Sequence, residues 1–441
     1  MSRYKPYPAY KDSGVEWIGE VPEHWAVRSV KYLYNARLGK MVQPLPKSEK
    51  DVLVPYHRAQ TVQWECIKYD QVESMWANPT EIDTYSLEDG DLLICEGGDV
   101  CRAAMFNRVE RETVIFQNSI HRVRPVGGNH PEWLLRLMQH VRSSGWIDVL
   151  CNKNTIVHFT SDKLASLECP NPPCSEQSEI LSALGRETAH IDALIAKKTR
   201  FIELLKEKRT ALITHAVTKG LNPNVKMKDS GVEWIGKMPE HWVLSKLKYI
   251  SRALIGLTYA PEDVVDNGSG ITVLRSTNIQ DGMLDMTDTV QVCKDIGKEL
   301  MAQVGDILIC SRNGSRALIG KNIQLDERSL GCTFGAFMTV LRGKYNDYLY
   351  YVLNSTMFDA NSALYMTSTV NQLTISMIDN MEVPLPPKTE QKIIVLQLRK
   401  ALMSLDTLST KTQRSINLLK ERRSAFITAA VTGQIDLRET I

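Results

Sequence analysis

EQSEILSALGRETAHIDALIAKKTRFIELLKEKRTALITHAV, residues 176–217, contains no proline and carries apolar residues at a seven-residue spacing. Two adjacent stripes result, and polar residues interrupt both of them. One stripe contains Leu184, Ile191, Lys198, Leu205 and Leu212, and the other contains Leu181, Thr188, Ile195, Ile202, Arg209 and Ala216. This spacing is typical of a coiled-coil seam. It predicts one long helix that requires a partner helix.

The same spacing recurs, in the same register, near the C-terminal end of the sequence. The repeated stripes contain Leu398, Leu405, Thr412, Leu419 and Phe426, and Val395, Leu402, Ser409, Ile416, Arg423 and Ala430. The natural partner of the central helix is therefore the C-terminal one. Because the chain leaves the first helix and must return to pair with the second, we predict two long antiparallel helices.

The sequence that precedes each long helix is also duplicated. KDSGVEWIGEVPEHW (11–25) and KDSGVEWIGKMPEHW (228–242) differ at only two positions. Further pairs are VRSVKYLYNARLGK (27–40) with LSKLKYISRALIGL (244–257), GDLLIC (90–95) with GDILIC (305–310), PEWLLRLMQHV (131–141) with NDYLYYVLNSTM (346–357), and PNPPCSEQ (170–177) with PLPPKTEQ (384–391). In this order they predict strands ending in a glycine turn, a buried strand, a short amphipathic helix and a proline stop before each long helix.

These repeats predict an α/β fold class with two mixed α/β domains that are related by internal duplication. Two long antiparallel coiled-coil helices separate the domains, and we expect a pseudo-twofold molecule. At 441 residues the chain is too long for a single core. The predicted boundaries are 1–170 for the first domain, 171–220 for the central helix, 221–385 for the second domain and 386–441 for the C-terminal helix.

The composition is that of an average globular protein, with 43% hydrophobic and 24% charged residues. No apolar run suggests a signal peptide or a membrane span, so we expect a cytoplasmic protein. The nine cysteines form no CxxC pair. Cys95 and Cys310 stand at matching places in apolar runs, which indicates buried reduced thiols rather than disulfides or a zinc site.

The formal net charge of +2 does not by itself indicate nucleic-acid binding. The segments 176–220 and 390–433 together hold 16 basic and 9 acidic residues, which leaves 37 basic and 42 acidic residues elsewhere. If the rest of the chain binds DNA, it must do so through segregated patches or with a partner that supplies phosphate contacts.

Two sequence patterns resemble catalytic motifs, but neither one matches its motif in full. NPPC (171–174) resembles the NPP signature of DNA amino-methyltransferases, but its copy at 385–388 lacks the Asn and both strings precede a helix. A helix stop is therefore favoured. GSRALIGK (314–321) has five residues between its glycines instead of four, and Asn322 replaces the Ser or Thr of a phosphate loop. A surface loop is favoured there.

Metal and nucleophile patterns are likewise missing from the sequence. His24 and His241 lie in the repeated PEHW string, without an HExxH pair or a cysteine at metal spacing. We interpret them as packed or capping histidines. No Pro-Asp dipeptide of the common nuclease type occurs. We therefore predict no catalytic site, no bound metal and no cofactor.

Arginine and amide side chains gather in polar loops at matching places in the two halves. Arg58 and Arg275 stand at the same place in the two copies of the repeat. The full set is Arg58, Gln60, Arg102, Lys153, Asn154, Arg275, Asn278, Arg312, Asn313, Arg316, Asn371 and Gln372. Guanidinium and amide groups are the ones that read guanine and adenine edges. As a set they predict DNA contacts, although each one alone also fits an ordinary solvated loop.

Trp17 and Trp234 occupy the same place in the two copies of GVEWIG. Tryptophan is favoured at the centres of interfaces, so both residues are candidates to anchor a partner. The alternative is that each one packs on its own domain.

The repeated strings, together with LLKEKRTALITHAVTKG (204–220) and LLKERRSAFITAAVTG (418–433), resemble the specificity subunit of type I restriction-modification systems. The resemblance covers nearly the whole chain. It implies two target recognition domains, each of which reads one half of a split double-stranded DNA sequence, held apart by the antiparallel helices. It also implies two methyltransferase subunits that carry S-adenosylmethionine and modify adenine, and restriction subunits that use ATP.

In that family this subunit carries no catalysis itself. NPPC departs from the more usual LPP-like string, which leaves the start of the central helix open. Since the loops differ between the halves, an asymmetric DNA target is expected. Two other classes remain as alternatives, a structural coiled-coil scaffold and a stand-alone methyltransferase or nuclease.

Overall fold

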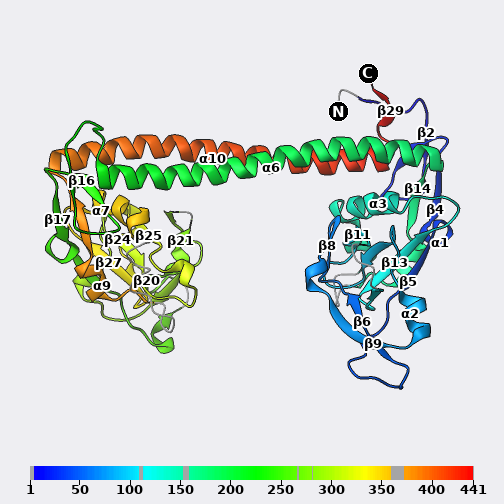
Figure 1. The fold of residues 1–441 in the computed structure, drawn as a ribbon, viewed down its shortest axis with the longest axis horizontal. Coiled ribbons are helices and arrows are strands. Elements are labelled where there is room, and N and C mark those ends of the chain that lie inside the picture. Colours follow the sequence, from blue (N-terminus) through cyan, green and yellow to red (C-terminus); the bar gives the residue numbers. More distant parts are fainter. Residues whose placement is uncertain are drawn as a thin grey trace. The chain divides into compact units, whose positions relative to one another are not determined.

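Figure 1 shows the computed structural model of the chain. It describes residues 4–108, 113–151, 158–265, 268–280, 282–358 and 372–440. The chain divides into two compact units, a first unit of 1–198 with 414–441 and a second unit of 199–413. Each unit therefore contains one α/β domain together with part of each long helix.

The first unit contains a four-stranded antiparallel sheet and a three-stranded sheet. The larger sheet has the order β11 (Ala103–Met105), β10 (Leu92–Cys95), β13 (Ile120–Pro125) and β5 (Tyr34–Leu38). The smaller has the order β12 (Ile115–Phe116), β6 (Val52–His57) and β9 (Glu73–Ala77), with β12 parallel to β6 and β9 antiparallel to it. All four residues of β10 are buried, which confirms the buried strand predicted from GDLLIC.

Two-stranded ribbons and short helices complete the first unit. The ribbons are β1 (Tyr4–Lys5) with β29 (Asp436–Thr440), β2 (Tyr10–Asp12) with β3 (Glu20–Pro22), β4 (Ala26–Ser29) with β14 (Glu168–Asn171), and β7 (Val62–Gln63) with β8 (Cys66–Ile67). The helices are α1 (Val30–Leu33), α2 (Pro79–Tyr85), α3 (Pro131–Ser143), α4 (Trp146–Leu150), α5 (Ser161–Ser166) and the 3-10 turn η1 (Tyr69–Gln71). Pairing of β1 with β29 brings the two ends of the described chain together (Figure 1).

The second unit repeats the strand order of both sheets and adds β19 at one edge. The antiparallel sheet contains β18 (Arg252–Ile255), β27 (Met338–Arg342), β24 (Ile307–Cys310) and β25 (Asn322–Gln324). The other contains β19 (Val264–Val265), β23 (Val290–Val292), β20 (Ile271–Leu274) and β26 (Thr333–Phe334), with β26 parallel to β20. The duplication seen in the sequence is thus a duplication of topology.

The ribbons of the second unit each have a counterpart in the first, whereas most of its short helical elements are 3-10 turns. The ribbons are β15 (Met227–Asp229) with β16 (Lys237–Pro239), β17 (Val243–Lys246) with β28 (Glu382–Leu385), and β21 (Ile279–Gln280) with β22 (Met283–Leu284). The helices are α7 (Asn346–Leu353) and α9 (Ile375–Asn380), with 3-10 turns η2 (Leu247–Tyr249), η3 (Pro261–Asp263), η4 (Ser276–Asn278), η5 (Lys298–Leu300), η6 (Arg316–Leu318) and η7 (Glu327–Ser329).

One expectation for the start of each domain was incomplete. The segments 27–40 and 244–257 do contain strands, but α1 interrupts the first and η2 interrupts the second. Val30, at the start of α1, donates its backbone N–H to Leu167 O (2.9 Å), and Leu247, in η2, donates to Met381 O (3.0 Å). A helical turn at this point lets the chain pass from the β4 or β17 ribbon to the main sheet.

The long helices are α6 (Cys174–Lys219) and α10 (Lys388–Val431), of 46 and 44 residues. Every residue of the predicted stripes is buried or half-buried, which confirms the seam on both helices. In the first unit the beginning of α6, with Leu184, shares a core with the end of α10, with Phe426. In the second unit the end of α6, with Ala216, shares a core with the beginning of α10, with Leu398. The helices are therefore antiparallel, as predicted.

Equivalent ion pairs join the helices within each unit. Arg423 Nε lies 2.9 Å from Asp192 Oδ1 in the first unit, and Arg209 Nη1 lies 2.6 Å from Asp406 Oδ1 in the second. The two aspartates are equivalent positions of the duplication, and so are the two arginines. Each helix thus supplies an Asp in its first half and an Arg in its second half, so the same pairing register holds in both units.

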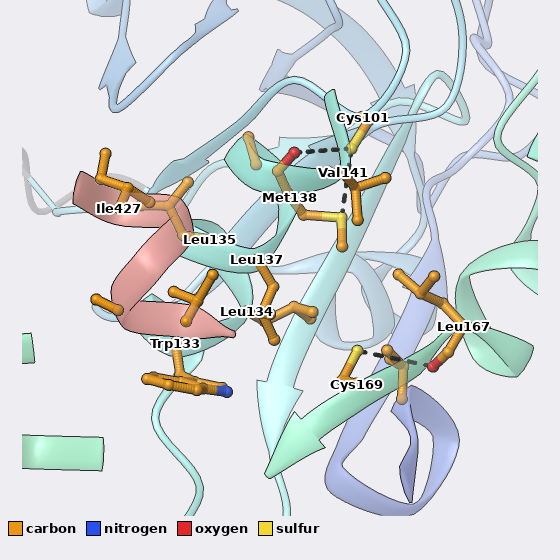
Figure 2. Packing of buried hydrophobic residues seen from close by; sticks show 14 of the residues in the cluster. Cys101, Trp133, Leu134, Leu135, Leu137, Met138, Val141, Leu167, Cys169 and Ile427 are labelled. Carbon is orange, nitrogen blue, oxygen red and sulfur yellow. Dashed lines mark hydrogen bonds between the residues drawn. The ribbon is translucent and has the colours of Figure 1, made fainter. Parts of the chain in front are cut away.

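The core of the first unit joins the α/β domain to the long helices. Figure 2 shows α3 side chains, among them Trp133 and Leu135, packed near Ile427 of α10. Trp133 is completely buried and donates Nε1–H to Pro170 O at 2.9 Å. In the second unit Tyr348 takes the same place on α7 and donates its hydroxyl to Pro384 O at 3.0 Å. The predicted short amphipathic helices are thus the elements that dock each domain.

The repeated PEHW string holds the first turn of each long helix. His24 Nε2 lies 2.9 Å from Glu176 Oε2, and His241 Nε2 lies 2.7 Å from Glu390 Oε2. Trp25 also donates Nε1–H to the Glu176 carboxylate at 3.1 Å. A carboxylate in the first turn of a helix is favoured by the helix dipole, and these partners fix its position. Both histidines thus have a structural role, but they bond the first-turn carboxylate rather than cap the helix backbone, and with side chains 45% and 46% exposed they are not packed in the core.

Candidate nucleic-acid interface

Two arginines follow equivalent strands at equivalent places in the two units. Arg58 comes directly after β6, and Arg275 comes directly after β20. Arg58 Nη2 lies 2.7 Å from Glu73 Oε1, and Arg275 Nη2 lies 3.1 Å from Asp288 Oδ2. Both arginine side chains are 31% exposed. The structure thus presents the same pair twice, a half-buried arginine beside an exposed carboxylate.

The turn that carries Arg58 is fixed from inside. Thr61 Oγ1 accepts from Arg58 N (3.2 Å) and donates to Arg58 O (2.8 Å). His57 is fully buried, and its Nδ1 lies 3.0 Å from the same hydroxyl. Burial lowers the pKa of His57 to about 4, so this imidazole is neutral near pH 7. A rigid turn therefore presents the Arg58 guanidinium.

Asn278 performs the corresponding internal role in the second unit, which corrects its assignment as a base-reading residue. Its side chain is fully buried, and Oδ1 accepts from Arg275 N at 2.8 Å. Its amide donates to Asp285 O (2.9 Å) and to Asp288 O (2.8 Å). Because all of these contacts are internal, we do not include Asn278 among the proposed DNA contacts. It positions Arg275 instead.

Arg102 also supports the turn after β6. Its side chain is 15% exposed, and Nη2 donates to Ala59 O at 2.6 Å. Gln60, next in that turn, is exposed. The loop after β10 therefore lies against the turn after β6, and the sequence placed candidate residues in both. Arg102 contributes mainly by fixing the turn, while Gln60 faces solvent.

The same two loops meet in the second unit. Asn313 Nδ2 donates to Ser276 Oγ at 3.3 Å. Arg312 is exposed, forms an isolated β-bridge with Gln372, and places its guanidinium carbon 5.3 Å from the Phe337 ring centroid. The structure thus brings Arg275, Arg312, Asn313 and Gln372 to one loop cluster, and Arg316 is exposed in the same loop.

The segment before each long helix reaches the same loops. Phe159 N donates to Glu96 O at 2.8 Å, and Leu373 N donates to Ser311 O at 2.7 Å. Lys153, Asn154 and Asn371, which the sequence also singled out, lie outside the described residues. Three chain segments therefore converge in each unit: the turn after β6 or β20, the loop after β10 or β24, and the segment that leads to the long helix.

Sequence reasoning missed Glu73, Asp288 and Phe337. Each of the two carboxylates comes from a later segment of the chain than its arginine, and no local motif connects them. Phe337 stands in an apolar stretch that reads as core, yet the residue is 59% exposed. Alignment of FGAF (334–337) with FQNS (116–119) places Ser119 of the first half at the position of Phe337. This alignment is the one sequence signal that the position does not need an apolar residue.

Trp17 and Trp234, left open between a partner anchor and internal packing, pack on their own units. Trp17 is half-buried, with its ring centroid 5.6 Å from that of His140 on α3. Trp234 is half-buried against the core of the second unit. The packing alternative therefore accounts for the repeated GVEWIG string.

Cysteine and metal chemistry add nothing to these loops. All nine cysteines, each within the described ranges, are free, and the predicted burial of Cys95 and Cys310 is confirmed. Burial raises the pKa of Cys95 to about 11, which keeps the thiol protonated. Among the residues that the structure describes, no cluster of His, Cys, Asp and Glu could hold a metal ion. Over the same ranges, none of the helices is both long and apolar enough to cross a membrane.

Comparison with known proteins finds similarity to one family. Residues 239–418 match the type I restriction modification DNA specificity domain. The specificity subunit of the type I restriction enzyme EcoKI from Escherichia coli strain K12 is 30% identical over 207 residues, 45% of this chain and 44% of that subunit. The chain thus matches slightly less than half the length of that curated relative.

Other similarities extend over the whole chain. The putative type I restriction enzyme MjaX specificity subunit of Methanocaldococcus jannaschii is 24% identical over 448 residues, 96% of both chains. A chain solved in work on complex assembly and conformational transition of the type I R-M system has a TM-score of 0.72 and 15% identity, and the match covers 93% of this chain and 98% of that one. The chain therefore shares the fold of that structure, and over residues 239–418 it is similar to the DNA specificity domain of type I restriction-modification systems.

Proposed function

We propose that this chain is the sequence-specific DNA-recognition subunit of a type I restriction-modification complex. Each target recognition domain reads one half of a bipartite DNA site. The observation that carries this proposal is the duplicated arginine–carboxylate pair, Arg58–Glu73 and Arg275–Asp288, on equivalent turns within loops whose other residues differ. Arginine is the side chain best suited to bidentate recognition of guanine. Different neighbours at each pair favour two different half-sites.

The proposed DNA contacts are the exposed and half-exposed members of the predicted set other than Arg102, whose guanidinium is bonded to the turn after β6. They are Arg58, Gln60, Arg275, Arg312, Asn313, Arg316 and Gln372, with Lys153, Asn154 and Asn371 retained from the sequence. Contacts to phosphates would position the protein, and contacts to base edges would specify the sequence. The carboxylates beside Arg58 and Arg275 hold each guanidinium in place before DNA arrives, and they disfavour non-specific contact with phosphate.

The proposal gives this chain no catalytic step. Its partners are double-stranded DNA, two methyltransferase subunits that bind S-adenosylmethionine, and restriction subunits that use ATP. The domains outside the long helices carry more acidic than basic residues, so phosphate contacts from the methyltransferase subunits would add to the affinity. The two long helices, whose pairing register is the same in both units, would set the spacer between the half-sites.

Coexpression with the methyltransferase subunits, followed by sequencing of methylated adenines, tests the proposal. We expect one bipartite motif. Replacing residues 26–165 by the equivalent segment of another family member should change one half of that motif and leave the other half intact. A change in both halves would refute independent reading by the two domains.

Two assays separate this proposal from its alternatives. A stand-alone methyltransferase or nuclease would transfer methyl groups or cut DNA as the isolated chain, whereas we expect neither activity. A purely structural scaffold would give no shift of DNA in a gel, with or without methyltransferase subunits. Sequence-specific binding by the assembled complex that is lost without this chain supports the recognition role.

A further inference from the structure

The second unit holds a large aromatic side chain in solvent on a fixed backbone. Phe337 lies between β26 and β27, and the residue is 59% exposed. Its carbonyl oxygen accepts hydrogen bonds from Ser311 N, Arg312 N and Ser311 Oγ, each at 3.0 Å. Three donors on one carbonyl leave this turn little freedom. The backbone that carries the ring is therefore fixed by the fold, while the ring itself lacks the apolar cover that a phenylalanine normally has.

The ring lies among the residues proposed to contact DNA. The Arg312 guanidinium carbon is 5.3 Å from its centroid, a cation–π arrangement. Arg312 is bridged to Gln372, and the next residue, Asn313, donates to Ser276 Oγ. A guanidinium stacked on a ring still presents its N–H donors at its edge. Phe337 and Arg312 thus form a unit with an apolar part and a hydrogen-bonding part.

The first unit has no such aromatic at the matching position, which shows that the fold does not require one. Alignment of FGAF (334–337) with FQNS (116–119) places Ser119 at the position of Phe337. The Ser119 hydroxyl accepts from Ala59 N at 3.1 Å and donates to Gln117 Oε1 at 3.3 Å. A small residue that closes the turn is therefore sufficient. The phenylalanine is a property of the second recognition domain alone.

We propose that Phe337 is a specificity-determining residue whose ring contacts the C5 methyl group of a thymine in the half-site read by the second domain. This inference rests on the proposed DNA-recognition function. The thymine methyl is the apolar group that base edges display in the major groove, and phenylalanine is a side chain that contacts it. Arg312, stacked on the ring, contacts the neighbouring base pair or its phosphate.

Insertion of the ring between two base pairs is the main alternative for an exposed aromatic on DNA. Such a wedge needs both faces of the ring. In this structure Arg312 already stacks over the Phe337 ring. An edge contact to a methyl group requires no displacement of Arg312, whereas insertion does. The observed arrangement therefore favours the methyl contact.

The test uses the complex of the full chain with its methyltransferase subunits and its mapped DNA motif. Each thymine in the second half-site is replaced in turn by deoxyuridine, which removes only the methyl group. We expect one replacement to weaken binding by the wild-type complex about fourfold, the contribution of one buried methyl group. That same replacement should have no effect on the Phe337→Ala complex. Phe337→Leu, which retains an apolar contact, should retain part of the effect.

Leu330→Ala provides a matched control, because Leu330 is a similarly exposed apolar residue of the second unit, at 61%. This variant should respond to deoxyuridine as the wild type does. Circular dichroism of each variant establishes that the fold is retained, which the exposure of both side chains predicts.

The outcomes separate this inference from the function on which it rests. Sequence-specific binding in which no deoxyuridine position depends on Phe337 overturns the inference alone. A second result also overturns the inference alone. If the fluorescence of 2-aminopurine placed in the half-site shows base unstacking in the wild-type complex, and Phe337→Ala abolishes that unstacking, the ring acts as a wedge between base pairs. A wild-type complex that binds all sequences alike overturns the proposed function and the inference together.

Discussion

Replacement of Glu65 by glycine would set two opposing effects against each other. Glu65 lies in the tight turn between β7 and β8 with a φ of 58°, in the left-handed region. The equivalent position in the second unit, in the turn between β21 and β22, is Gly282, with a φ of 74°. Left-handed backbone costs a residue with a side chain about 1 kcal/mol. Backbone conformation alone therefore predicts that Glu65→Gly stabilises the first unit.

The side chain of Glu65 predicts the opposite effect. Its carboxylate pairs with Arg136 and Arg423, whose side chains are 8% and 19% exposed. Burial raises the pKa of Glu65, but the two guanidinium groups outweigh burial and hold that pKa below its ordinary value. Loss of one partner from a buried ion pair costs roughly 3–5 kcal/mol. Arg136 keeps Glu132 and Arg423 keeps Asp192, both at 2.9 Å, so we expect a smaller loss.

With those remaining partners, the loss of the Glu65 carboxylate should cost roughly 2 kcal/mol. Glu65→Gly, which also relieves the backbone, should then destabilise the first unit by roughly 1 kcal/mol. Glu65→Ala keeps the left-handed backbone and should show the full loss of roughly 2 kcal/mol. The difference between the two variants isolates the contribution of the backbone.

Urea unfolding followed by tryptophan fluorescence is the assay. Six of the eight tryptophans lie within residues 1–198, so the signal reports mainly on the first unit. Asp406→Asn, which removes a carboxylate that is 61% exposed from an ion pair of the second unit, is the control and should cost at most about 1 kcal/mol. If Glu65→Gly raises the stability of the first unit, the ion network contributes less than the backbone strain costs and the reasoning is wrong.

Three further predictions address recognition, pH and spacing. Arg58→Ala and Arg275→Ala should each weaken binding by about 1–3 kcal/mol, and only toward variants of one half-site. Binding titrations against single-base variants decide this, and a uniform loss over all sequences would identify phosphate contacts instead. Because the unfolded chain takes up a proton on His57 near pH 6.5 and the folded chain only near pH 4, His57 alone should destabilise the first unit by up to about 1.4 kcal/mol per pH unit as the pH falls between these values. Urea titrations at several pH values measure this slope, and a first unit equally stable at pH 7 and pH 5 would contradict it. Duplicating Ile202–Leu205, with α10 lengthened to match, adds about 6 Å of helix and should widen the DNA spacer by one or two base pairs. An unchanged spacer in the methylated motif of an active enzyme would show that the helices do not set the distance.

Much of the fold could be predicted because its strongest signals are periodic or duplicated. The seam on α6 and α10 follows from seven-residue spacing, and the buried strands β10 and β24 follow from matching apolar runs. Short elements were harder. The four-residue helix α1 lies between two strands because Val30 and Leu33 are buried there, which is a tertiary effect without a local signature.

The candidate site could be predicted at the level of loops but not of single side chains. Arg58 and Arg275 were selected because they stand at the same place in the duplication, and their contacts with bases stay a prediction. Asn278 was misassigned, since the sequence gives its hydrogen-bonding capacity but not the direction in which the amide points. Its hydrogen-bonding capacity is used by three backbone groups of the same unit, those of Arg275, Asp285 and Asp288. Phe337 was missed for the converse reason, because an apolar residue in an apolar stretch gives no sign of exposure.

Comparison of the two halves distinguishes structural roles from recognition roles without other sequences. His24 and His241 occupy the same place in the two halves and have the same structural role, because each binds the first-turn glutamate of a long helix. Ser119 and Phe337 differ, and they stand at the same place in the loop clusters. A position that serves the fold must satisfy the same contacts twice, whereas a position that reads DNA must satisfy a different base pair in each half-site. Under the proposed function, divergence at an exposed position on a rigid backbone is therefore the feature by which further recognition residues of this chain can be found.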